Sequence, residues 1–154
     1  MAFSQPQVYL DELAKPILER FKAEPDSYDL AVATCIILYH FSDVVGRVRR
    51  IKGPVAADQI AEKVPEFATV RALANAGKHV ELERHPNTAL VGLRAEHMKK
   101  GSGAAFNDGA DGSTKADATR QIVVDTPDGE THDVLHTCNS TFAALIAEQE
   151  FLQS

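Results

Sequence analysis

Three polar residues at four-residue intervals, Arg71, Asn75 and His79, have the types and spacing of a small reactive site. Residues i and i+4 of a helix lie one turn apart on the same face, so a helix here would stack a guanidinium, an amide and an imidazole. Arginine binds phosphate through paired hydrogen bonds, and histidine transfers protons near neutral pH. The pattern predicts a site that holds a phosphate and moves a proton. Arg71, Asn75 and His79 are its candidate catalytic residues, and the adjacent Lys78 is a candidate binding residue.

A second polar group precedes this one in the chain. His40, Asp43 and Arg47 are spaced i, i+3 and i+7, which places them on one face of a helix. If the two helices are antiparallel neighbours, His40 or Asp43 comes near Arg71 and His79, so all three are candidate binding residues. The alternative is structural: Asp43 and Arg47 form an ordinary pair one turn apart, and His40 is a partly buried helix histidine.

Cations concentrate in the segment Gly46–Lys52, which holds four Lys and Arg residues in six positions. The whole chain has a net charge of −6, which argues against sequence-independent binding of long DNA. A local basic patch on an acidic protein suits a short phosphate-bearing ligand. The alternative is a solvated C-terminal end of a helix, where the helix dipole favours cations.

Hydrophobic periodicity and Pro/Gly signals predict the elements that position these residues. Helices are expected over residues 8–23, 28–50, 56–63 and 66–82, with Pro16 kinking or splitting the first and Gly53-Pro54 ending the second. A strand is expected over 88–94 and a mobile loop over 100–115. A β-hairpin is expected from strands 120–125 and 131–135 around the turn Thr126-Pro-Asp-Gly129. An amphipathic helix is expected over 137–154, capped near Thr137 or Asn139.

These elements predict an α+β fold that is mainly α: a helical bundle with a small antiparallel hairpin or sheet and a C-terminal helix. A chain of 154 residues most simply forms one domain. The bundle would span 1–84, the strands and the Gly-rich loop 85–136, and the last helix 137–154. Gly77 costs a helix about 1 kcal/mol relative to alanine, which predicts close packing of its helix on a neighbour.

Composition narrows the protein class. An apolar content of 44% is enough for a core, and a charged content of 25% is ordinary. The longest apolar run, 30–39, is shorter than the roughly 20 residues that span a bilayer, and residues 1–6 lack a signal-peptide pattern. We therefore expect a cytoplasmic protein with no membrane partner. Cys35 and Cys138 form no CxxC motif, and Cys35 is expected to be a small buried hydrophobic residue.

No metal or cofactor is expected. His132 and His136 have the spacing of a helical zinc pair, but they fall on or beside the predicted strand, where four residues span about 13 Å. The segment 107–113 lacks the alternating oxygen ligands of a calcium loop, and no P-loop, dinucleotide fingerprint or serine elbow is present.

The helical lead-in followed by a helix with Arg71, Asn75, Lys78 and His79 resembles the HEPN domains, small helical-bundle proteins common in bacterial toxin–antitoxin and phage-defence systems. The resemblance covers at most residues 1–85 and implies metal-independent RNA cleavage, often at a site shared across a homodimer. It implies that Arg71 holds the scissile phosphate, Asn75 orients groups and His79 transfers a proton. Ala72 stands where the family has a polar residue, and seven residues separate Arg71 from His79, more than is usual. The chain also resembles bacterial proteins with an Ala-Asn-Ala-x-Lys-His helix, a grouping that supplies no function.

Two functions from different classes follow. The first is a HEPN-like RNA-binding or ribonuclease effector. Its expected partners are RNA or another phosphate-bearing ligand and a second copy of the chain in a homodimer. The second is a non-catalytic protein-interaction or oligomerisation module, in which the same side chains bind a partner or a second subunit. An exposed, electropositive column favours the first function. A buried column satisfied by its neighbours favours the second.

Overall fold

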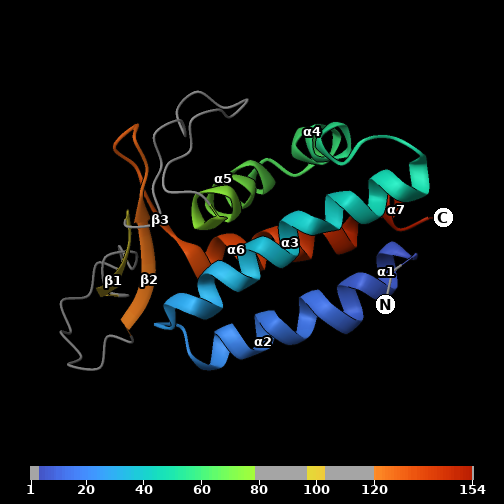
Figure 1. The fold of residues 1–154 in the computed structure, drawn as a ribbon. Coiled ribbons are helices and arrows are strands. Elements are labelled where there is room, and N and C mark those ends of the chain that lie inside the picture. Colours follow the sequence, from blue (N-terminus) through green and yellow to red (C-terminus); the bar gives the residue numbers. More distant parts are fainter. Residues whose placement is uncertain (1–3, 79–96, 103–119, 154) are drawn as a thin grey trace.

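The structure, a computed structural model, describes residues 4–78, 97–102 and 120–153. Within these ranges the fold is α+β and mainly α, as predicted, with a helical bundle and a small antiparallel sheet at one end (Figure 1). In chain order the elements are α1 (Pro6–Tyr9), a π-helical turn η1 (Leu10–Ala14), α2 (Lys15–Ala23), α3 (Tyr28–Arg49), α4 (Gly53–Lys63), α5 (Glu66–Lys78), β1 (Met98–Ser102), β2 (Arg120–Asp125), β3 (Thr131–Asp133), α6 (Val134–Ala147) and α7 (Gln149–Leu152).

In the first helical segment, 6–23, a π-helical turn before Pro16 separates two α-helical parts, so the segment is split near this proline as the sequence predicts. The Lys15 amide bonds to the carbonyl of Leu10, five residues back, which widens one turn of the helix. Proline cannot donate a backbone hydrogen bond and its ring crowds the preceding turn. The wider turn is the form in which the chain passes Pro16 while staying helical.

Helix α3 is the central element, and it packs against α1, η1, α2, α4, α5 and α6. The sequence predicts an apolar stripe along this helix that consists of Leu30, Ala33, Ile37, Phe41, Val44, Val48 and Ile51. Leu30, Phe41 and Val44 are buried, and the other four are half-buried. A second set that the stripe omits is buried as well, including Cys35 and Leu38. By length and composition α3 could cross a membrane, and 56% of its apolar window is buried inside this fold, as in a core helix.

The boundary between α3 and α4 differs from the prediction. Gly53-Pro54 does not end α3, since Arg50 already caps it in the left-handed conformation, with a φ of 57°. Gly53 and Pro54 instead form the first turn of α4, which therefore begins three residues before the predicted start at residue 56. Proline suits this position, because the first amides of a helix have no partner within it.

Helix α5 lies antiparallel to α3, which is the arrangement on which the approach of His40 or Asp43 to Arg71 depended. Phe67 near its start packs on Tyr39, with ring centroids 6.3 Å apart, while Gly77 near its end approaches Val32. A Cβ added at Gly77 would lie 2.8 Å from Cγ1 of Val32. The glycine therefore permits the predicted close approach, and the alanines beside it, Ala72, Ala74 and Ala76, are fully buried.

The sheet has the strand order β1-β2-β3, with both pairs antiparallel. Residues 100–102, predicted as the start of a mobile loop, belong to β1, where Gly101 approaches the side chain of Val123 closely. Without a side chain, Gly101 lets β1 pack against β2, so glycine here favours pairing rather than a loop. The sheet is fixed to the α2–α3 turn, because the Ile122 amide donates to the Pro25 carbonyl over 3.1 Å.

The β-hairpin is confirmed, with Gly129 at a φ of +87° in its turn. Its second strand is shorter than predicted, because Val134 and Leu135 already belong to α6. Asp133 caps α6 by accepting a hydrogen bond from the His136 amide over 3.0 Å, so the predicted caps further along the helix are wrong. An aspartate directly before a helix is a strong N-cap.

The two ends of the chain meet away from the sheet, where α1 contacts α7 (Figure 1). Helix α7 continues the predicted terminal helix after a break at Glu148. The predicted strand 88–94, residues 79–82 of the predicted fourth helix and residues 103–115 of the predicted loop lie outside the described residues.

Candidate functional site

Arg71, the residue predicted to hold a phosphate, is largely buried and bonded to other helices of the fold. Its Nη1 donates to Oδ1 of Asp58 on α4 over 2.7 Å, and its side chain is 13% exposed. The guanidinium carbon lies 5.9 Å from the ring centroid of Tyr39 on α3, which adds a cation–π contact. Arg71 therefore links α5 to α4 and α3, and Asp58 already offsets its charge.

The other members of the predicted column are only partly described. Asn75 is half-buried on α5, one turn beyond Arg71. Lys78 is the last residue of α5, and His79 lies outside the described residues. The stacking of Arg71 and Asn75 at helical spacing agrees with the sequence pattern, and the role of His79 stays a prediction.

His40 and Asp43 form a hydrogen-bonded pair on α3. The distance from Nδ1 of His40 to Oδ2 of Asp43 is 2.6 Å, and both side chains are about half exposed. The imidazole also packs beside Tyr39, with ring centroids 5.8 Å apart. A carboxylate that fixes one ring nitrogen sets the orientation of the other, which is how proteins position a histidine for proton transfer. Tyr39 thus contacts both His40 and Arg71.

The carboxylate of Asp43, on α3, also contacts the first residue of α4. A Cβ at Gly53 would stand 2.2 Å from Oδ1 of Asp43, so the carboxylate packs directly on the first residue of that helix. A negative charge beside a helix N-terminus is favoured by the helix dipole. Asp43 also acts on Tyr9, whose hydroxyl donates to the Ile37 carbonyl over 2.7 Å. Burial raises the pKa of Tyr9 well above its usual value, and the charge of Asp43 raises it further.

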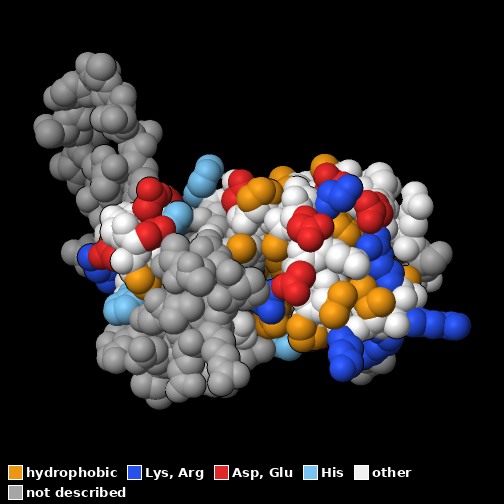
Figure 2. All heavy atoms as spheres, turned by 90° about the horizontal axis from the view of Figure 1, so that it is seen from above, with side chains coloured by type: hydrophobic (Ala, Val, Ile, Leu, Met, Phe, Trp, Pro, Cys, Tyr) orange, Lys and Arg blue, Asp and Glu red, His pale blue; other side chains and the backbone are white. Residues whose placement is uncertain are grey.

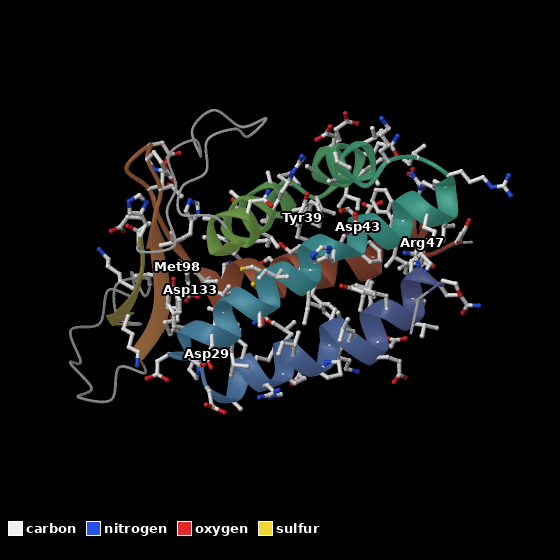
Figure 3. All side chains as sticks on the ribbon, in the orientation of Figure 1. Asp29, Tyr39, Asp43, Arg47, Met98 and Asp133 are labelled. Carbon is white, nitrogen blue, oxygen red and sulfur yellow. The ribbon has the colours of Figure 1, made fainter. Side chains whose placement is uncertain are left out.

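Asp43 and Arg71 therefore both contact α4, from α3 and from α5. Figure 3 shows Tyr39 and Asp43 on the side of α3 that faces α5 and α4. Asp43 and Arg47 are spaced as an ordinary helix pair. No ion pair joins them in the described residues, because Asp43 is directed to His40 and Gly53 instead.

The basic segment divides into two parts. Arg49 is half-buried, and it donates to the Glu150 carbonyl over 2.9 Å and to Gln59 over 3.1 Å. Arg47, Arg50 and Lys52 are exposed, and no ion pair holds any of them within the described ranges. We call these three residues the basic end. Figure 2 shows Lys and Arg side chains gathered away from the sheet, where α3 ends and α4 begins.

The described part of the chain contains no group of three or more His, Cys, Asp and Glu residues placed to hold a metal ion. His132 lies in β3, whereas His136 lies in the first turn of α6 rather than on the predicted strand. At the sheet, Asp125 accepts hydrogen bonds from Lys99 and Thr131, and the Lys99 contact is the main cause that lowers the pKa of Asp125. These groups stabilise the strands.

Sequence reasoning missed Asp58 and Tyr39, the two partners of Arg71. Asp58 lies 13 residues before Arg71 on a different helix, so no helical spacing connects them. Tyr39 is next to His40 and four residues before Asp43, and this position is the one sequence signal that could have added Tyr39 to the candidate site.

Comparisons with protein families, with curated proteins and with solved structures found no match to this chain.

Proposed function

We propose that this protein is a HEPN-like helical domain that binds RNA, or another phosphate-bearing ligand, at the basic end. The observation that carries the proposal is the exposure of Arg47, Arg50 and Lys52 beside one another in the chain, in a protein whose net charge is −6. Exposed cations contribute to phosphate binding, whereas cations already paired with carboxylates contribute little. The unpaired ones are therefore the residues that a phosphate would meet first.

We propose binding without Arg71-dependent cleavage. A guanidinium stabilises a reacting phosphate only if its donors can face the ligand. One donor of Arg71 is held by Asp58, and the side chain is 13% exposed. For Arg71 to serve in catalysis, it would have to leave Asp58 and the face of Tyr39. Cleavage that uses His40 with Asp43, or His79, is the outcome that would extend the proposal.

The binding test uses a fluorescently labelled single-stranded RNA of mixed sequence and anisotropy titrations at several salt concentrations. The variant Arg47→Gln/Arg50→Gln/Lys52→Gln removes the basic end. The control Lys15→Gln/Arg20→Gln/Lys22→Gln removes three exposed cations from α2, of which Lys22 is paired with Glu19. Each phosphate contact on a single strand contributes about 0.7 to the salt slope, so we expect the first variant to lower the slope by about 2. Equal weakening by both variants, or no binding by wild type at low salt, would contradict the proposal.

The cleavage test incubates the same RNA with wild-type protein in a metal chelator. We expect intact RNA. If wild type cuts the RNA, Arg71→Ala and His79→Ala identify whether the predicted column is responsible, and Asp58→Asn reports whether release of Arg71 raises the rate.

The alternative proposal is a non-catalytic protein-interaction or oligomerisation module. The observation that favours it is that Arg71 is only 13% exposed and is paired with Asp58, since a buried column satisfied by its neighbours is what this second function predicts. Light scattering of the purified protein distinguishes the two proposals: a stable dimer that binds no RNA supports the module, while RNA binding lost with the basic end supports the domain proposed above.

A further inference from the structure

Cys35 and Cys138 are 103 residues apart in the chain, yet their sulfurs lie 3.7 Å apart. Cys35 is on α3 and Cys138 on α6, and each is fully buried as a free thiol. Two thiols in contact can react with each other, whereas two separate buried cysteines cannot. Neither has a role in the proposed RNA binding.

We propose that Cys35 and Cys138 are a redox modification site that closes into a reversible intramolecular disulfide between α3 and α6. A disulfide bond is about 2.0 Å long, so the sulfurs must approach each other by less than the width of an atom. The two helices already pack on each other, and their sulfurs already face. We therefore expect the two side chains to close this gap without a new arrangement of helices.

The oxidant that fits this site is a small peroxide, because bulkier disulfide reagents have no access to a buried thiol. One cysteine sulfur attacks hydrogen peroxide, forming a sulfenic acid and releasing water. The second sulfur then attacks the sulfenic sulfur, which forms the S–S bond and releases a second water. The two thiols lose two electrons and two protons in total, and the peroxide gains them.

Burial sets the rate of this reaction. The thiolate is the reactive form, and the hydrogen bond with the neighbouring Cys35 sulfur, together with burial, raises the pKa of Cys138. We therefore expect slow oxidation that goes to completion, rather than the fast response of an exposed sensor. Once formed, the bond encloses a loop of about 100 residues, and such loops give disulfides their largest effect on the unfolded chain.

The experiment treats the folded full-length protein with hydrogen peroxide, removes the peroxide, unfolds the protein and counts thiols with a maleimide. We expect wild type to lose both thiols together, and a non-reducing peptide map to show Cys35 joined to Cys138. We also expect Tm to rise by about 5 to 15 °C and to return to its starting value after dithiothreitol.

The variants Cys35→Ala and Cys138→Ala are the controls, since neither can form the bond and neither should show the Tm rise. The thiol count on wild type does not depend on how well these variants fold. Three outcomes would overturn the proposal: both thiols survive in folded protein but are oxidised in urea, the products are sulfinic acids, or the disulfides join separate molecules.

Discussion

Arg71 is a charged side chain held largely out of water by two partners of different kinds, a carboxylate on α4 and an aromatic ring on α3. Its Nε is buried, and no hydrogen-bond partner is found for it among the described residues. The ion pair with Asp58 is therefore a main contribution that offsets the cost of burying the guanidinium. A partly buried charge that loses its partner is more costly than an exposed one.

At this residue we predict that Asp58→Asn lowers the free energy of unfolding by about 1 to 2 kcal/mol, since Arg71 keeps its charge and loses its anion. Urea unfolding at pH 7 measures the change. Glu62→Gln is the matched control, because it removes an exposed carboxylate from the same helix with no ion pair in the described residues. Equal stability of the two variants would show that the Asp58–Arg71 pair contributes nothing.

The residues of the candidate site differ in how far the sequence could reveal them. The His40–Asp43 contact is between neighbours on one helix, so spacing alone suggests it. The Asp58–Arg71 pair needs the packing of two helices, which no local pattern contains. The sequence therefore shows that Arg71 belongs to a polar column and leaves unseen the carboxylate that binds it.

At the scale of elements, the short helix α7 is fastened to the bundle by its own polar contacts. Arg49 binds Glu150 through its carbonyl at 2.9 Å and its carboxylate at 3.1 Å, and Lys63 lies 3.3 Å from that carboxylate. The guanidinium of Arg49 also lies 4.9 Å from the ring centroid of Phe151, which is buried. Helix α7 has only four residues, so these contacts rather than its length keep it in place.

We predict that the contribution of Glu150 to stability depends on pH. The hydrogen bond from Arg49, and then the one from Lys63, lowers the pKa of Glu150 below its usual value of 4.5. A carboxylate with a lowered folded pKa stabilises the protein above its unfolded pKa, and loses this effect as the pH falls through the folded pKa. Glu150→Gln should therefore be less stable than wild type at neutral pH, and the gap should shrink as the pH drops below about 4.5.

Urea unfolding across that pH range checks this prediction, with Glu148→Gln as the control because its carboxylate forms no ion pair in the described residues. A gap that stays constant with pH would assign the effect of the variant to packing rather than charge.

Elements were easier to predict than their boundaries. The Pro-Asp-Gly turn defines the hairpin, because only a few residue types fit its geometry. Gly53-Pro54 was ambiguous, since proline ends one helix and suits the first turn of the next equally well. Here Arg50 already ends α3 in the left-handed conformation, so Gly53 and Pro54 are free to begin α4.

At the scale of the whole molecule, the bundle is arranged around α3. A hydrophobic stripe indicates one buried face of a helix, but a central helix is buried on several, so periodicity alone does not reveal it. The residues outside the predicted stripe that are nevertheless fully buried include Ala31, Thr34, Cys35 and Leu38.

We predict that Leu38→Ala destabilises the protein by about 2 to 5 kcal/mol, because it opens a cavity where α3 is fully buried. Unfolding should remain a single transition, with the same midpoint by circular dichroism and by tyrosine fluorescence. Val8→Ala is the control, since Val8 is 40% exposed and its truncation should change little. Separate midpoints for the two probes would show that the bundle does not unfold as one unit.

The position of α3 also has a consequence for how the molecule opens. Amide protons in the middle of this helix are shielded on several sides by α2, α4, α5 and α6. They can exchange with deuterium only when those neighbours separate, whereas the amides of α7 can exchange by local fraying. The slowest-exchanging amides in the described part of the chain should therefore lie in α3, and their exchange rate would report the free energy of opening the entire bundle.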